Sequence, residues 1–321
     1  MIFRRRLTME SRKRKAFWLY LVLVYAITWL PWIPVEVYAA QRGYVMPNPR
    51  TIPQLIENGF QDNTHLILVL LTFVSILLPG TVIGGILAQQ YESGKAGLRG
   101  WWQRVTRWRV GWRGYGIMLG LLALIYLPIL VFGMLKGPLP PAGQVSTVLV
   151  SLVPMFVYTF LASGMEEPGW RGYLLPSLQA RMSAKKASFI VGIVWGIWHW
   201  PVFIPMYIAT LSSPGGVPQA VVTLLVQVVL YTAGSIMSGA LIYTWLYNRT
   251  GSAFVCILFH VIHNDIGTYM LMLFPNIGDT IPIIGTLMQW IIAIVLMRFF
   301  WTEARESKTG QFAVQGQPSE I

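Results

Sequence analysis

The chain has 321 residues, of which 55% are hydrophobic and only 11% are charged. Soluble domains carry about 25% charged residues, so a water-facing globule of this size would lack a polar surface, and a soluble enzyme is excluded. In a soluble protein, a net charge of +12 would suggest nucleic acid as the partner. The cytoplasmic loops of membrane proteins carry a similar excess of Lys and Arg, so no nucleic-acid partner is expected. Cys256 is the single cysteine, which excludes an intrachain disulfide and a cysteine-based metal cluster.

Apolar segments long enough to cross a membrane recur along the chain. A helical crossing needs about 20 mostly apolar residues, because the hydrocarbon core is about 30 Å thick. Eight segments meet this requirement: 17–40, 65–89, 114–135, 146–165, 187–205, 219–247, 252–274 and 280–301. We therefore predict an all-α polytopic integral membrane protein with about eight transmembrane helices in one bundle, over residues 17–306. A basic cytoplasmic tail (1–16) is expected before this domain and a disordered tail (307–321) after it.

The positions of Lys and Arg predict the orientation of the bundle. All of them except Arg42, Arg50 and Lys136 lie in the N-terminal tail, in the even-numbered loops or at the C-terminal end. Because Lys and Arg gather in cytoplasmic loops, both termini are expected to be cytoplasmic. A loop-poor chain with a basic N-terminus is typical of a prokaryotic plasma membrane. Trp and Arg alternate in the loop 97–112, which we expect to lie among cytoplasmic lipid headgroups.

Two adjacent carboxylates lie at the cytoplasmic end of the fourth predicted crossing. Ionisable groups inside a membrane cost about 2.5–3.5 kcal/mol each and usually mark function. Glu166 and Glu167 point about 100° apart on a helix, which favours different tasks. Glu167 has the spacing of an ion pair with Arg171, although Pro168 and Gly169 bend the backbone there, and Glu166 is then free to act as a general base. The alternative is that both glutamates only bind Arg171 and nearby basic residues.

Imidazole and amide groups lie in two later crossings. His199 lies in the fifth crossing, and a single histidine among tryptophans is by itself more often a packed core residue than a catalyst. His260 and Asn264, in the seventh, are one helical turn apart, so both side chains reach the same point. His263 lies on a neighbouring strip of the same helix face, and it could either form a helix–helix hydrogen bond or support the site. Asp265 points elsewhere. Such groups on neighbouring helices can activate a water and stabilise the oxyanion formed at a carbonyl, and they also suit a proton relay.

The three motifs, in this order, resemble those of the CPBP intramembrane endopeptidases, the Abi-type family that includes type II CAAX prenyl endopeptidases and bacteriocin-processing enzymes. The positions that match its patterns EExxxR, FxxxH and HxxxN are Glu166, Glu167 and Arg171, then Trp195 and His199, then His260 and Asn264. The motif core spans about 146–275. The resemblance implies that Glu167 and Arg171 give structural support. Trp195 stands where the pattern has Phe, which we expect to alter the shape of the pocket more than its chemistry.

The resemblance implies an endopeptidase that cuts a peptide bond near the cytoplasmic membrane face, in a lipidated CAAX-type protein or a peptide precursor. It further implies that Glu166, assisted by His199, activates the hydrolytic water. His260 and Asn264 would stabilise the oxyanion.

The cofactor and the alternatives to a peptidase stay open at this point. The family is often described as metal-dependent, and Glu166, His199 and His260 are the candidate ligands of a divalent ion such as zinc. A metal-free mechanism led by the glutamate would use the same residues. A proton-coupled transporter could use them as a relay, and a catalytically silent immunity or scaffold protein could retain them without using them.

Overall fold

A computed structural model describes residues 2–47, 51, 55, 58–77, 79–211, 213–303, 305–306 and 312–313. The first half contains α1 (Ile2–Arg42), α3 (Asn63–Leu77), α4 (Gly80–Val105), α5 (Gly111–Lys136) and α6 (Ala142–Ala162). An interrupted helical segment follows, made of η1 (Gly164–Glu166), α7 (Glu167–Gly169), η2 (Trp170–Leu174) and α8 (Leu175–Gln179). The next elements are α9 (Ala184–Trp198), η3 (Trp200–Phe203), α10 (Ile204–Leu211), α11 (Gly216–Tyr231), η4 (Thr232–Ile236) and α12 (Met237–Thr250). The last are α13 (Ala253–Leu273), η5 (Pro275–Ile277), α14 (Thr280–Val295), η6 (Leu296–Phe300), β1 (Arg305–Glu306) and β2 (Phe312–Ala313).

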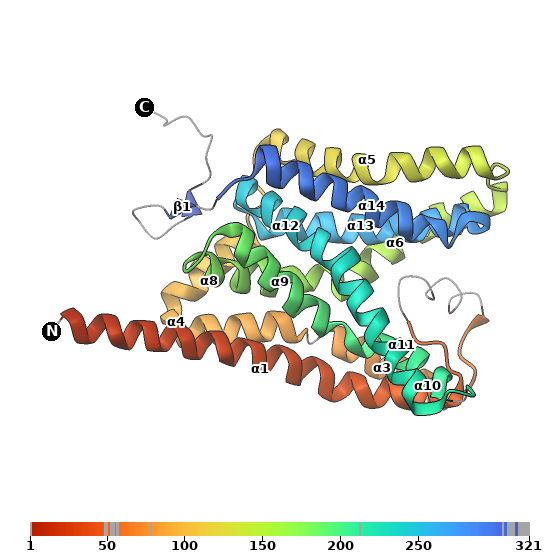
Figure 1. Cartoon of the computed structure of the whole chain (residues 1–321), viewed down its shortest axis with the longest axis horizontal. Helices are drawn as coiled ribbons and strands as arrows, with labels where there is room; N and C mark the ends of the chain where they lie inside the picture. The colour runs from red at the N-terminus through yellow and green to blue at the C-terminus, as the bar shows by residue number, and fades with distance from the viewer. Residues whose placement is uncertain are drawn as a thin grey trace.

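The helices run along one long axis of the bundle, as a membrane protein requires (Figure 1). Six described stretches are long and apolar enough to cross a membrane: Glu10–Arg42, Gly111–Lys136, Ala142–Gln179, Gly216–Thr250, Ala253–Leu273 and Thr280–Phe300. Ala184–Trp198 and Trp200–Leu211 add a seventh if they are counted as one span bent by 44°. The prediction of an all-α polytopic membrane protein is confirmed, whereas the count of eight crossings is not.

The predicted second crossing, 65–89, is not one continuous helix. α3 ends at Leu77 and α4 begins at Gly80, because Pro79 lacks an amide donor and disfavours a helical conformation at the residue before it. α4 changes direction again at Gly94, whose φ of +60° is readily adopted only by glycine. The apolar composition continues across Pro79, so composition alone suggested a single crossing.

The structure describes parts of both predicted tails. Residues 2–16 belong to α1, the helix that continues through the predicted first crossing. In the predicted disordered tail, Phe312–Ala313 pairs with Arg305–Glu306 as an antiparallel hairpin, and the remainder of 307–321 lies outside the described residues.

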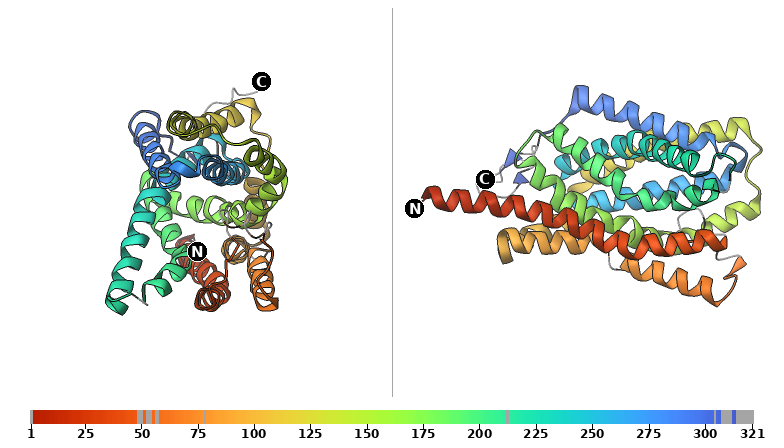
Figure 2. Two further views of the ribbon diagram at one scale, coloured as in Figure 1. Left: turned by 90° about the vertical axis from the view of Figure 1, so that its right-hand side faces the viewer. Right: turned by 60° about the horizontal axis from the view of Figure 1, so that its bottom comes forward.

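α13 occupies the interior of the bundle, where it packs against α5, α6, α7 and α12 (Figure 2). One apolar core surrounds it, and Trp170 and Phe259 are among its largest buried side chains. Arg171 is as fully buried as these apolar residues. A buried guanidinium requires a buried counter-charge, so the core must also contain an acid.

Side chains of α4 hold the interrupted segment that follows α6. Pro168 donates no backbone hydrogen bond, and the π turn at 170–174 changes the bonding pattern, so carbonyl groups here need partners from other elements. The bonds that α4 supplies are Thr81 Oγ1 to Met165 O at 2.9 Å, Trp101 Nε1 to Pro168 O at 2.9 Å and Arg104 Nη2 to Gly172 O at 2.9 Å. α4 therefore fixes the segment that carries the first motif.

Gly169 is the point of close approach between this segment and α4. A Cβ atom there would lie 2.6 Å from the Thr81 carbonyl oxygen and 2.7 Å from the Tyr20 hydroxyl. Because the φ of Gly169 is an ordinary −80°, the cost of a side chain is purely steric. We expect Gly169→Ala to lower the free energy of unfolding by about 1–3 kcal/mol, measured by thermal unfolding in detergent. Gly120→Ala is the control, because a Cβ there meets nothing within 4 Å; equal melting temperatures for the two variants would contradict the prediction.

Candidate active site

Glu166 ends the short helix η1, and it is only 6% exposed. Its Oε2 atom accepts hydrogen bonds from two indoles, at 2.6 Å from Trp195 Nε1 and at 3.2 Å from Trp170 Nε1. Its Oε1 atom has no hydrogen-bond partner among the described residues. The carboxylate is therefore held by one oxygen and can accept a proton from water on the other.

Glu167 forms the predicted ion pair, with its Oε1 atom 2.9 Å from Nη1 of Arg171 and both side chains fully buried. The backbone stays helical across Pro168, so the i,i+4 spacing brings the two charges together. The guanidinium carbon lies 4.7 Å from the ring centre of Trp195 and 4.4 Å from that of Tyr243. In the described structure only the second glutamate binds the arginine, which differs from the alternative in which both do.

His260 reaches the same glutamate from α13. Its Nδ1 atom lies 3.0 Å from Glu167 Oε1, and because an ionised carboxylate only accepts, Nδ1 carries the proton. The Nε2 atom has no hydrogen-bond partner in the residues described. Glu167 thus joins the first motif to the third and leaves Nε2 as the unbonded nitrogen of His260 among the described residues.

His199 lies where α9 stops. Pro201 prevents a regular continuation of the helix, and the carbonyl of Trp195 accepts instead from Nδ1 of His199 at 2.8 Å. A carbonyl is an acceptor, so this bond fixes the proton on Nδ1 and leaves Nε2 as an acceptor in the neutral ring. His199 is half-buried.

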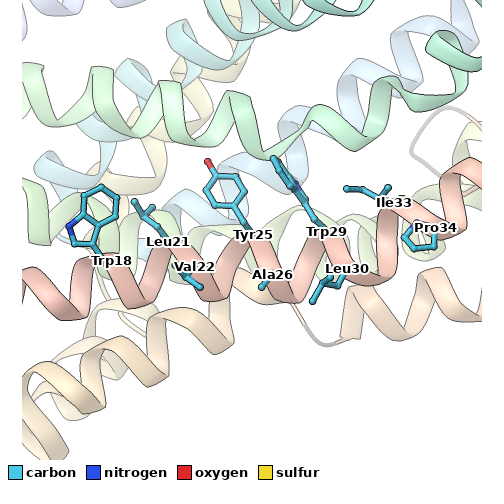
Figure 3. A pocket seen from close by; sticks show the side chains of 9 residues that line it. All are labelled: Trp18, Leu21, Val22, Tyr25, Ala26, Trp29, Leu30, Ile33 and Pro34. Carbon is cyan, nitrogen blue, oxygen red and sulfur yellow. The ribbon is translucent and has the colours of Figure 1, made fainter.

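α1 supports the same end of α9. Tyr25 donates from its hydroxyl to the carbonyl of Val194 at 2.8 Å, and Trp29 donates from Nε1 to the carbonyl of Trp198 at 3.0 Å. Figure 3 shows both side chains pointing from α1 toward α9, on a face that also lines an open apolar groove. These bonds satisfy carbonyl groups that flank the second motif.

The ring of Trp195 lies between the motifs. Its centre is 5.8 Å from the ring centre of His199 and 5.5 Å from that of His260. Its Nε1 atom binds Glu166, and its face contacts Arg171. Residues from three distant parts of the chain therefore meet at one site around a single buried indole.

Comparison with known proteins identifies this part of the chain. Residues 148–266, which contain all three motifs, match the family model described as type II CAAX prenyl endopeptidase Rce1-like. Over this range the chain resembles an Rce1-like domain. It is also 50% identical over 50 residues to CAAX prenyl protease 2 of Methanococcus maripaludis, a stretch that covers 16% of this chain and only 18% of that relative. Over residues 148–266, the match agrees with the CPBP-type motifs.

The other polar residues of α13 in the Rce1-like domain have separate surroundings. Asn264 lies one turn beyond His260 and is half-buried. His263 faces α5, where its Nδ1 atom is 2.9 Å from the hydroxyl of Tyr126. Asp265 accepts a bond of 2.6 Å from Oγ1 of Thr159 on α6. His263 and Asp265 thus join neighbouring helices, while Asn264 stays on the side of α13 that carries His260.

The side chains of the Rce1-like domain do not fit a metal ion as they lie. In the part of the chain that the structure describes, no three His, Cys, Asp or Glu side chains are placed to hold one. Catalytic zinc sites use three protein ligands, so no step below is derived through a metal.

Several residues at the site were not found by sequence reasoning. Trp170 follows Glu166 at the same i,i+4 spacing as the predicted ion pair, so this spacing could have indicated it. Tyr126 is one of two tyrosines in the apolar helix α5, and nothing in the sequence marks it as a partner of His263. The α4 donors Thr81 and Trp101 also give none, because backbone carbonyls in an interrupted helix cannot be read from composition.

Proposed function

We propose that the Rce1-like domain is an intramembrane endopeptidase in which Glu166 is the general base. One observation carries this proposal. The buried carboxylate of Glu166 is held through one oxygen by two indoles, and its other oxygen has no hydrogen-bond partner among the described residues. The nearby imidazoles of His199 and His260 each bond through Nδ1 and leave Nε2 unbonded within the same part of the chain. Preorganised groups in a site shielded from water are the main source of electrostatic catalysis.

The attack begins with a water bound to Oε1 of Glu166. As the water oxygen bonds to the carbonyl carbon, one of its protons passes to the carboxylate and the carbonyl electron pair moves to the oxygen. Nε2 of His199 accepts a hydrogen bond from the other proton and orients the water. When the tetrahedral intermediate collapses, the carbon–nitrogen bond breaks and Glu166 returns its proton to the leaving amine.

The oxyanion would be stabilised by His260 and Asn264. Nε2 of His260 donates when the ring is protonated, and Glu167 accepts from Nδ1 and offsets the positive charge of that ring. The side-chain amide of Asn264 offers a second donor from the same helix. Arg171 in turn holds Glu167 in place.

The substrate we propose is a lipidated CAAX-type protein or a peptide precursor, cut near the cytoplasmic face. The names of the matched family and of the archaeal relative refer to CAAX prenyl proteins. The start of α1 and the end of α14 lie at the same end of the bundle (Figure 1), which suits the proposed cytoplasmic termini. The bound lipid of such a substrate would remain in the bilayer that surrounds the apolar helices.

The test is hydrolysis by the purified protein in detergent. A farnesylated CAAX peptide, its unmodified form and an unbiased peptide library are incubated with wild type and with Glu166→Gln. Cleavage by wild type alone supports the proposal, and the ratio of the two CAAX peptides measures the contribution of the lipid. No cleavage by folded wild type would contradict a peptidase and favour the transporter or the silent scaffold.

Metal removal is expected to leave hydrolysis within about two-fold of the untreated rate, because the side chains lack a three-ligand arrangement. The measurement is the initial rate after dialysis against 1,10-phenanthroline and after dialysis against its non-chelating isomer. Loss of activity with the chelator alone, reversed by added zinc, would contradict the metal-free mechanism.

A further inference from the structure

Two indole N–H groups bind the same oxygen of Glu166, and they come from different elements. Trp170 lies four residues after Glu166 in the same interrupted segment, and its bond of 3.2 Å is long. Trp195 belongs to α9, and its bond of 2.6 Å is short. Hydrogen bonds to an ionised group are shorter and stronger than neutral ones, so the α9 indole is the principal donor.

The Trp195 ring has no room to turn away from this position. It is 3% exposed, and its faces and edges contact the rings of His199 and His260 and the guanidinium of Arg171. A phenyl ring at position 195 would keep most of these contacts but would carry no donor. The difference between Trp and Phe here is therefore chemical as well as steric, contrary to the expectation from sequence.

The hydrogen bond from Trp195 to Glu166 also fixes the distance between the first and the second motif. Trp195 accepts from His199 through its backbone carbonyl at 2.8 Å and donates to Glu166 through its side chain at 2.6 Å. One residue thus sets the positions of both groups that would hold the attacking water. Small displacements of such groups cost large factors in rate.

We propose that Trp195 is a positioning residue that holds Oε2 of Glu166 in place, so that Oε1 faces the hydrolytic water at a fixed distance from His199. This inference rests on the proposed function. Trp195 is 3% exposed and offers little surface to a substrate, so we expect it to affect the rate of the chemical step and not substrate binding.

The kinetic test compares Trp195→Phe with Trp198→Phe. Trp198 lies on the same helix, and its indole donates to Thr28 Oγ1 at 3.1 Å, so the control also loses one buried indole bond. Trp195→Phe is expected to lower kcat about ten-fold with KM unchanged, which corresponds to about 1.4 kcal/mol. Trp198→Phe should change kcat by less than about two-fold. A loss shared by both variants, a rise in KM alone, or an unchanged kcat would overturn the proposal.

A spectroscopic test of the bond needs no substrate. In protein labelled with ¹⁵N-tryptophan, the indole signal of Trp195 is the one that disappears in Trp195→Phe. A short bond to a carboxylate places this proton far downfield, and Glu166→Gln should move it upfield, while the Trp198 signal stays in place. An unmoved signal would refute the bond. If wild type cleaves nothing, the proposed function and the kinetic role fail together, but the indole signal still decides whether Trp195 holds Glu166.

Discussion

Glu166→Gln is expected to lower the rate of peptide hydrolysis by about 10²–10⁴-fold, the usual contribution of a general base. Gln keeps the shape of the side chain and still accepts from the indoles of Trp170 and Trp195. It has no carboxylate oxygen that can take a proton from water. The melting temperature should therefore stay close to that of wild type while the initial rate falls. The two measurements are made on the same detergent preparation.

Glu36→Gln is a matched control for this prediction. Glu36 is also buried, at 9% exposure, and its Oε1 atom accepts from Nε1 of Trp32 at 3.1 Å. It lies on α1, and none of its described contacts involves the candidate site. Its replacement should leave hydrolysis unchanged. If Glu166→Gln keeps more than a tenth of the wild-type rate, or if both variants lose activity equally, the assignment of the base is wrong.

Glu167→Ala is expected to lower the free energy of unfolding by about 3–5 kcal/mol, the usual cost of leaving one member of a buried ion pair uncompensated. Arg171 is wholly buried, and Glu167 is its acceptor, while the Nε and Nη2 atoms of Arg171 have no partner among the described residues. The aromatic rings of Trp195 and Tyr243 offset only part of this charge. The melting temperature in detergent and resistance to added protease measure the effect.

The double variant Glu167→Leu with Arg171→Met separates charge from packing. It removes both charges and keeps side chains of similar length, so it should be more stable than Glu167→Ala. It should nevertheless be inactive, because His260 loses the acceptor of its Nδ1 proton. A double variant no more stable than Glu167→Ala would show that the cavity, and not the unpaired arginine, causes the loss.

Two features of the site could be predicted from the sequence: the ion pair within the first motif, and the gathering of ionisable side chains inside the bundle. Glu167 and Arg171 are one turn apart on a backbone that remains helical, so local geometry decides their ion pair. His199 and His260 are ionisable groups in apolar segments, and burying such groups in lipid is so costly that they gather inside the bundle. These contacts follow from physical rules that sequence alone can express.

The features that sequence did not predict depend on tertiary contacts or on single backbone positions. Pro79 interrupts an apolar stretch that is otherwise long enough for a crossing, so composition overestimates the number of spans. The bond from Trp195 to Glu166 requires the orientation of α9 against the segment after α6, which no spacing rule gives. The same holds for His263, whose partner Tyr126 lies far away in the chain.

The hydrogen bonds from α1 and α4 to backbone carbonyls define how much of the chain must fold together. Both helices precede the matched range 148–266, yet they supply the donors for the carbonyls around the first two motifs. A fragment limited to that range would expose these carbonyls to lipid without donors, at a cost of several kcal/mol each. The range 148–266, which the motifs make recognisable, is therefore smaller than the cooperative unit that stabilises it. A minimal active version of this protein has to retain α1 and α4, although neither helix carries a recognisable motif.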